Sequence, residues 1–333
     1  KHPNGRIGTV PITGILNLNS RMKHELVKPK GKGNTMSKAK KVFERFVLVA
    51  VAVALLAGLP AILAGCPIVS LKRLAVSFTG LESLGPDYVY EGWLLVDGAP
   101  VTAGRFTVDD EGMLSDDMFL ISESNASAAT AYILTIEPAV GDDPAPSDTH
   151  ILGGDVVSGT AALTVDHATA LGDDFLLASG EFILNTPSTA DDDTDYDHGI
   201  WWLDPSAGPG ASLVLPVLPA GWVYEGWVVG PAGPLSTGRF VDVSGDDSDL
   251  GGPTAGPDGT PPFPGQDYIE PPMVLTGYTA VISVEPDPDN SSAPFLLKPL
   301  VDASIEDVGI GVPQSMANNA AATNPTGTVT IAD

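Results

Sequence analysis

The chain is poor in cysteine, in basic residues over most of its length, and in catalytic motifs. Its 333 residues include one cysteine, Cys66, so no intramolecular disulfide can form. Of the 16 Lys and Arg residues, 11 precede Cys66, whereas of the 42 Asp and Glu residues only Glu25 and Glu44 do. Residues 67–333 therefore carry 40 acidic and 5 basic side chains. This excludes nucleic acid as a partner, because no basic patch remains to release phosphate counterions.

Signatures of catalysis are also missing. The sequence has no Gly-x-Ser-x-Gly elbow, P-loop, His-Glu-x-x-His or Cys-x-x-Cys. Only His150, His167 and His198 follow Cys66, and none of them recurs in the duplication described next. We therefore expect a protein that is not an enzyme and needs no cofactor.

The most informative feature that is present is a repeated phrase. Residues 88–108 read YVYEGWLLVDGAPVTAGRFTV and residues 222–243 read WVYEGWVVGPAGPLSTGRFVDV. Glu137 and Glu285 lie in a second shared phrase, and residues 179–184 and 326–331 form a third. Ordered anchors with small changes of spacing predict two copies of one domain. The repeat signature consists of Tyr90, Glu91, Trp93, Arg105, Phe106 and Glu137, which recur as Tyr224, Glu225, Trp227, Arg239, Phe240 and Glu285.

Each copy reads as β-structure. Short runs rich in β-branched and aromatic residues alternate with Gly, Pro and Asp, which favours antiparallel strands. We expect an all-β fold of two tandem antiparallel β-sandwich (Ig-like) domains after an N-terminal apolar signal or anchor helix. The expected divisions are a disordered tail or upstream extension (1–35), a lipoprotein signal peptide (36–65), a tether (66–73), the first repeat (74–187), an acidic linker (188–207) and the second repeat (208–333).

The repeat signature admits two interpretations. A hairpin turn at Gly98-Ala99 would place Trp93 opposite Gly104, and Arg105 on the face of Tyr90 in a cation–π arrangement. Arg105 and Arg239 could bind an anion, or they could pair with Glu91 and Glu225; their retention beside differing loops favours the structural role. The aromatic residues could stack sugars or fill a core. Glu137 and Glu285 each precede a proline, which favours a cap or turn.

The N-terminal region predicts a membrane anchor. A basic start after Met36 is followed by an uncharged stretch that ends in Leu63, Ala64, Gly65 and Cys66. Small residues before a cysteine, at the end of an apolar segment, are typical of the bacterial lipobox, where the thiol is acylated and the preceding peptide is removed. We therefore expect lipid on Cys66 and a location on the outer face of the membrane. The alternative is a single-pass membrane protein with an extracytoplasmic C-terminus.

An acidic run offers a possible calcium site. Asp191, Asp193, Asp195 and Asp197 precede Gly199 at a density of carboxylates that calcium prefers. The run lacks the spacing and closing Glu of an EF-hand, and it has no counterpart in the first copy. The other interpretation is a solvated acidic surface that supports solubility or reflects a saline habitat.

The repeated motifs resemble one known family. Tyr90-Glu-Gly-Trp-Leu-Leu, Gly104-x-Phe106 and Leu134-Thr-Ile-Glu-Pro138 are similar to the C-terminal extracytoplasmic domain of anti-sigma-K factor (RskA-type) proteins. The second copy matches through Tyr224–Val229, Gly238, Phe240 and Val284-Glu-Pro286. The resemblance implies an outer sensing or regulatory module. Members are implied to carry a cytoplasmic sigma-binding domain before one membrane helix, and the 45 residues before the apolar segment lack the apolar helical periodicity for it.

The sequence thus favours a lipid-anchored extracytoplasmic binding or sensing protein in envelope regulation, with a protein partner in the envelope. Two alternatives stay open. One is a structural or adhesive calcium-binding surface lipoprotein, and the other is a carbohydrate-binding lipoprotein that uses Trp93 and Trp227.

Overall fold

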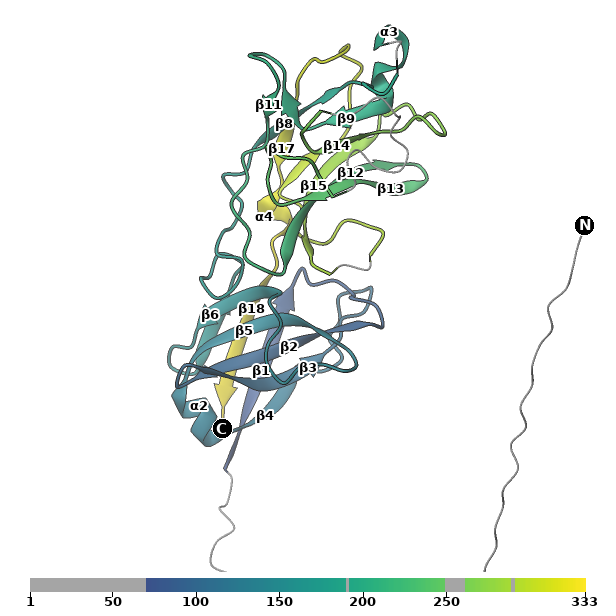
Figure 1. Ribbon diagram of the computed structural model, residues 1–333. Coiled ribbons are helices and arrows are strands. Elements are labelled where there is room, and N and C mark those ends of the chain that lie inside the picture. Colours follow the sequence, from purple (N-terminus) through teal and green to yellow (C-terminus); the bar gives the residue numbers. More distant parts are fainter. Residues whose placement is uncertain (1–69, 190–191, 249–260, 289–290) are drawn as a thin grey trace, which may run out of the picture. The chain divides into compact units, whose positions relative to one another are not determined.

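In the computed structural model of the chain, Ile68–Asp333 forms one compact unit. The structure describes residues 70–189, 192–248, 261–288 and 291–333 (Figure 1). The expected apolar helix, Leu63, Ala64, Gly65 and Cys66 lie outside these residues. Within the described residues, no helix is both long and apolar enough to cross a bilayer.

The described chain is almost entirely antiparallel β-structure, which confirms the all-β prediction. Two four-stranded sheets, in the orders β4-β1-β18-β7 and β3-β2-β5-β6, form the first of two strand assemblies. A bridge between Gly153 and Thr164 joins the two sheets at β6 and β7. The strands are β1 (Leu71–Thr79), β2 (Tyr88–Val96), β3 (Ala99–Phe106), β4 (Met118–Ser122), β5 (Ala129–Pro138), β6 (His150–Asp155), β7 (Thr160–Leu163) and β18 (Thr326–Ala332).

The second assembly is one eight-stranded sheet in the order β13-β12-β15-β16-β17-β8-β9-β14. Its strands are β8 (Gly180–Leu184), β9 (Gly199–Trp201), β12 (Trp222–Gly230), β13 (Gly233–Phe240), β14 (Gly265–Asp267), β15 (Thr279–Pro286), β16 (Leu300–Asp302) and β17 (Gln314–Asn318). The short strands β10 (Leu203–Asp204) and β11 (Gly210–Ala211) pair separately. The described helices are α2 (Glu123–Ala128), α3 (Asp192–Asp195), the 3-10 turn η2 (Tyr196–His198) and α4 (Ala320–Thr323).

The strands of the two assemblies follow the same spatial order. The last strand of each sequence copy, however, lies in the assembly formed by the other copy: β18 in the first assembly and β8 in the second. In the first assembly β18 pairs with β1 and β7, and in the second β8 pairs with β9 and β17. The registers agree, since Leu74 faces Ile331 in one assembly and Ile200 faces Leu184 in the other. In Figure 1 the yellow β18 accordingly lies with β1, far from it in sequence.

This exchange changes how the sequence repeats map onto the sheets. Residues 180–184, expected in the first repeat, belong to the second assembly, and residues 326–331, expected in the second, complete the first. The second assembly is therefore a continuous segment, β8 to β17, inserted between β7 and β18. The chain crosses between the assemblies twice, and side-chain amides join the two crossings. Asn318 Nδ2 donates to the carbonyls of Phe175 and Ala178, and Asn324 Nδ2 donates to that of Asp174.

One hydrophobic cluster runs through both assemblies. Tyr90, Leu94, Trp202, Tyr224 and Leu300 are among its fully buried members. Side chains along β1 and β18 alternate between the core and the surface. Leu74, Val76 and Val329 are buried, whereas their neighbours along the strands are partly or fully exposed.

The register of the first hairpin differs from the expected one. The turn is Asp97-Gly98, both with positive φ, so Val96 pairs with Ala99 and Glu91 faces Arg105. A bulge between Gly92 and Trp93 shifts the register, and Trp93 lies opposite Thr102. The glycines make room for other side chains: a Cβ on Gly92 would lie 1.9 Å from the Tyr132 hydroxyl, and one on Gly104 would lie 2.1 Å from the Phe119 ring.

Candidate functional site

The repeat signature forms a buried hydrogen-bonded network in the first copy. Trp93 Nε1 donates to Thr135 Oγ1 over 2.9 Å, and that hydroxyl donates to Glu137. Glu137 also accepts from the backbone N–H of Ser147, 2.9 Å away. The glutamate before the proline therefore holds the loop after β5, as the cap interpretation expects.

The second copy repeats this network. Trp227 Nε1 donates to Ser283 Oγ over 2.8 Å, Ser283 donates to Glu285, and Glu285 accepts from the N–H of Phe295 at 2.9 Å. The Trp and Glu side chains are the same in both copies, whereas the hydroxyl residue changes from Thr to Ser and the loop N–H donor from Ser147 to Phe295. A network retained in this way fixes the relation between two strands and a loop.

The two arginines pair with the buried glutamates. Arg105 Nε lies 3.2 Å from Glu91 Oε2, and Arg239 Nε lies 3.0 Å from Glu225 Oε2. Arg105 also donates to the Pro138 carbonyl and lies 3.3 Å from Asp142. Burial raises the pKa of Glu91, while the hydrogen bond from Thr102 and the charge of Arg105 oppose that rise. These contacts support a structural role for both arginines.

The tyrosines of the signature contact phenylalanines and loop carbonyls. Tyr90 stacks on Phe106 with ring centroids 5.6 Å apart, and Tyr224 stacks on Phe240 at 5.7 Å. The Tyr90 hydroxyl donates to the carbonyl of Glu82. The expected cation–π contact of Arg105 with Tyr90 is thus replaced by an ion pair and an aromatic stack.

The burial of Trp93 and Trp227 bears on whether they could bind a sugar. Trp93 is 3% exposed and Trp227 is 2% exposed. Neither indole presents a face on which a sugar ring could stack, so both side chains serve the core. The repeat signature therefore explains the fold.

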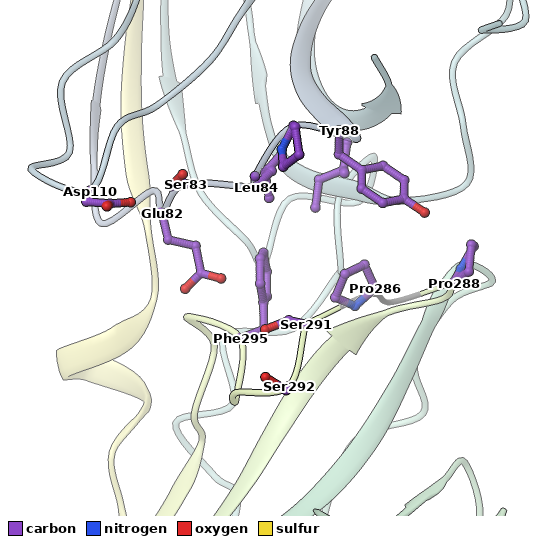
Figure 2. A pocket seen from close by; sticks show the side chains of 13 residues that line it. Glu82, Ser83, Leu84, Tyr88, Asp110, Pro286, Pro288, Ser291, Ser292 and Phe295 are labelled. Atoms are coloured by element: carbon purple, nitrogen blue, oxygen red, sulfur yellow. The ribbon is translucent and has the colours of Figure 1, made fainter. Parts of the chain in front are cut away.

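A pocket of about 410 Å³ lies where loops from the two copies meet. Its upper wall in Figure 2 comes from the β1–β2 loop and the start of β2, and its lower wall from the end of β15 and the loop after it. The lining residues are Glu82, Ser83, Leu84, Gly85, Pro86, Tyr88, Asp110, Ile136, Pro286, Pro288, Ser291, Ser292 and Phe295. A volume of this size suits one or two side chains of a partner or a small ligand.

The chemistry of this inter-copy pocket is apolar and acidic. In Figure 2 Tyr88 and Leu84 lie across the space from Pro286, Pro288 and Phe295. Glu82 and Asp110 add carboxylates, serines add hydroxyls, and none of the lining residues is basic. Glu82 interacts electrostatically with the half-buried Lys298, whose pKa burial lowers. The pocket therefore suits a cationic group on an apolar stem.

Sequence reasoning did not identify this pocket. Its walls are non-equivalent loops, and although Tyr88, Ile136 and Pro286 lie in duplicated phrases, no residue of the repeat signature lines the pocket. A usable signal would have been Tyr88, Pro286 and Pro288, because aromatic and proline side chains at strand ends are suited to a binding wall.

The acidic run is only partly described. Asp191 and the side chain of Asp193 lie outside the described residues. The carbonyl of Asp195 accepts from Thr186 Oγ1 at 2.6 Å, and Asp197 lies 3.8 Å from His198. Among the residues that the structure describes, no three His, Cys, Asp or Glu side chains gather as a metal site. The calcium site stays a prediction.

Comparisons with known proteins agree with the motif resemblance. Curated proteins gave no match, and solved structures gave none either. The model of one protein family matches residues 68–150, a segment that runs from β1 to the start of β6 and includes Glu91, Trp93, Arg105 and Glu137. In that segment the chain is similar to the family described as anti-sigma-K factor rskA, C-terminal.

Proposed function

We propose that the chain is a non-catalytic, extracytoplasmic binding or sensing protein of the cell envelope. The observation that carries this proposal is the match of residues 68–150 to the C-terminal domain of anti-sigma-K factors. That domain is the part of the family expected outside the cytoplasm, and its regulatory character argues against catalysis. The duplicated networks support the same view, because they build a rigid scaffold and leave function to the loops.

The protein is held on the outer face of the membrane by acyl chains on Cys66. The support is the sequence Leu63-Ala64-Gly65-Cys66 after an apolar segment. Two or more acyl chains anchor a protein stably, whereas one alone is marginal. Residues 67–333, which include both strand assemblies, then lie outside the cell.

The inter-copy pocket is the binding site in this proposal. Its carboxylates and apolar walls suit a lysine or arginine side chain presented by a partner protein of the envelope. The strong negative charge of residues 67–333 speeds the approach of a basic segment.

Intact mass spectrometry of the protein from bacterial membranes tests the anchor. We expect a mature chain that begins at Cys66 and carries acyl groups. The Cys66→Ala variant should keep its N-terminal segment and lose the acyl mass. A wild-type chain that is unacylated, or a variant processed in the same way as wild type, would overturn the lipid anchor and favour the single-pass alternative.

A further inference from the structure

One face of the first assembly is almost free of charge. Strands β4, β1, β18 and β7 alternate between inward and outward side chains, as their burial shows. We call the outward set the open face. It consists of Leu71, Arg73, Ala75, Ser77, Thr79, Met118, Leu120, Ser122, Thr160, Ala162, Thr326, Thr328, Thr330 and Ala332. Arg73 is the only charged residue among them, and none is acidic.

The absence of carboxylates from this sheet face is unusual for this chain. Residues 67–333 hold 40 acidic side chains, and they lie mostly in loops and at strand ends around the rest of the surface. The fourteen outward positions of the open face therefore form a sheet face without one Asp or Glu. Lys72 and Arg73 also bring two of the five basic residues to β1, where Lys72 pairs with Glu123 and Asp333.

The second assembly covers the equivalent face with its own chain. Ile183, Trp201, Leu203 and Phe263 form a separate buried cluster there. The register aligns Ile183 with Thr330 and Trp201 with Ala75. The same face of the same fold is thus buried in one copy and open in the other.

Large apolar side chains lie on the open face along β4 and the start of β1. Leu71 is 52% exposed, Met118 is 55% exposed and Leu120 is 67% exposed. Leu120 lies opposite Arg73, and Met118 lies opposite Ala75. This edge therefore combines a cation with apolar groups, which is the combination that interfacial membrane contacts use.

We propose that the open face lies against the outer leaflet of the membrane. The inference rests on the proposed function for its anchor. Leu71 follows Cys66 by five residues, a span of at most about 18 Å, so the anchor keeps this end of β1 near the lipid. A tethered protein with a strongly negative surface turns a face without carboxylates toward anionic headgroups, because its acidic faces are repelled. The inter-copy pocket then remains available to a partner.

Methionine oxidation after chemical tethering tests the proposal. The chain from Cys66 to Asp333 contains both partners of every described strand pair, and its one thiol can be coupled to maleimide lipid in phosphatidylethanolamine–phosphatidylglycerol vesicles. Peroxide oxidation of Met118 is compared by mass spectrometry with that of Met113, which is 66% exposed in the turn before β4. Coupling should slow oxidation of Met118 severalfold and leave Met113 unchanged.

Matched variants identify the cause of any protection. Leu120→Glu should abolish the protection of Met118, whereas Val217→Glu, at a site 94% exposed in the loop before β12, should preserve it. Equal oxidation of coupled and uncoupled Met118 would overturn the proposal. So would protection that precedes coupling and grows with protein concentration, because a second copy would then cover the face. Since maleimide replaces the natural lipid, this result does not depend on whether Cys66 is acylated in cells.

Discussion

Glu91 and Glu225 are buried carboxylates whose arginine partners lie at the protein surface. Their side chains are 5% and 4% exposed, whereas those of Arg105 and Arg239 are 37% and 33% exposed. Removing one partner of such a pair leaves an uncompensated buried charge, which costs more than the pair itself contributes. The duplication supplies a control, because the same change can be made in either copy.

Arg105→Met should lower the free energy of unfolding by about 2 to 3 kcal/mol at neutral pH, and Arg239→Met by a similar amount. Burial already raises the pKa of Glu91, and loss of Arg105 raises it further. The folded variant therefore binds a proton at higher pH than the unfolded chain does. Its deficit should shrink as the pH falls toward the unfolded pKa, where a neutral carboxyl needs no cation.

Urea unfolding at neutral and mildly acidic pH measures this effect. The double variant Glu91→Gln with Arg105→Met serves as control, since its deficit should not vary with pH in the same way. A deficit of Arg105→Met that is unchanged by pH would mean that the arginine acts through packing alone.

At the scale of elements, the exchange of β8 and β18 defines what can fold alone. The second assembly is continuous from β8 to β17, whereas the first needs β18 from the end of the chain. β18 lies between β1 and β7, so its loss opens a central position of the sheet and exposes backbone groups on both neighbours.

Residues 175–320 should fold alone, whereas residues 188–333 should not. The first fragment contains every strand of the second assembly, and the second lacks β8 and carries an unpaired β18. Circular dichroism and tryptophan fluorescence of the two fragments check this, because both contain Trp201, Trp202, Trp222 and Trp227. A cooperative unfolding transition in 188–333 and none in 175–320 would contradict the exchange.

The sequence predicted the strands well and the pairing poorly. The segments around Trp93 and Trp227 have strand-forming residues followed by turn residues, a local pattern that predicts a hairpin. Both segments form the first strand of a hairpin in the structure. The predicted register of the first hairpin was wrong because the strand has a bulge after Gly92. Tyr132 from β5 occupies the space beside Gly92, and counting residues from the hairpin turn does not take that neighbour into account. The exchange was not foreseen either, because residues 180–184 and 326–331 have similar patterns and fit either sheet. The inter-copy pocket was not predicted, because its walls come from loops far apart in the sequence.

At the scale of the whole molecule, charge dominates the surface. Residues 67–333 carry 40 acidic and 5 basic side chains. Repulsion among the carboxylates therefore destabilises the folded state at low ionic strength. The melting temperature should therefore rise with sodium chloride, and millimolar calcium in place of EDTA should add nothing once the salt is high. Thermal melts with EDTA or with millimolar calcium, each at low and at high sodium chloride, test this prediction. A calcium-dependent rise that persists at high salt would favour the structural or adhesive alternative and a site in the run from Asp191 to Asp197.

In the proposed function, a partner protein binds in the inter-copy pocket outside the cell. The most direct measurement places a photo-cross-linking amino acid at Tyr88, which lines the pocket, or at Val217, which does not, and irradiates intact cells. We expect a discrete adduct with an envelope protein from position 88, weakened by Glu82→Gln, and none from position 217. No adduct at 88, or the same adducts at both positions, would contradict it.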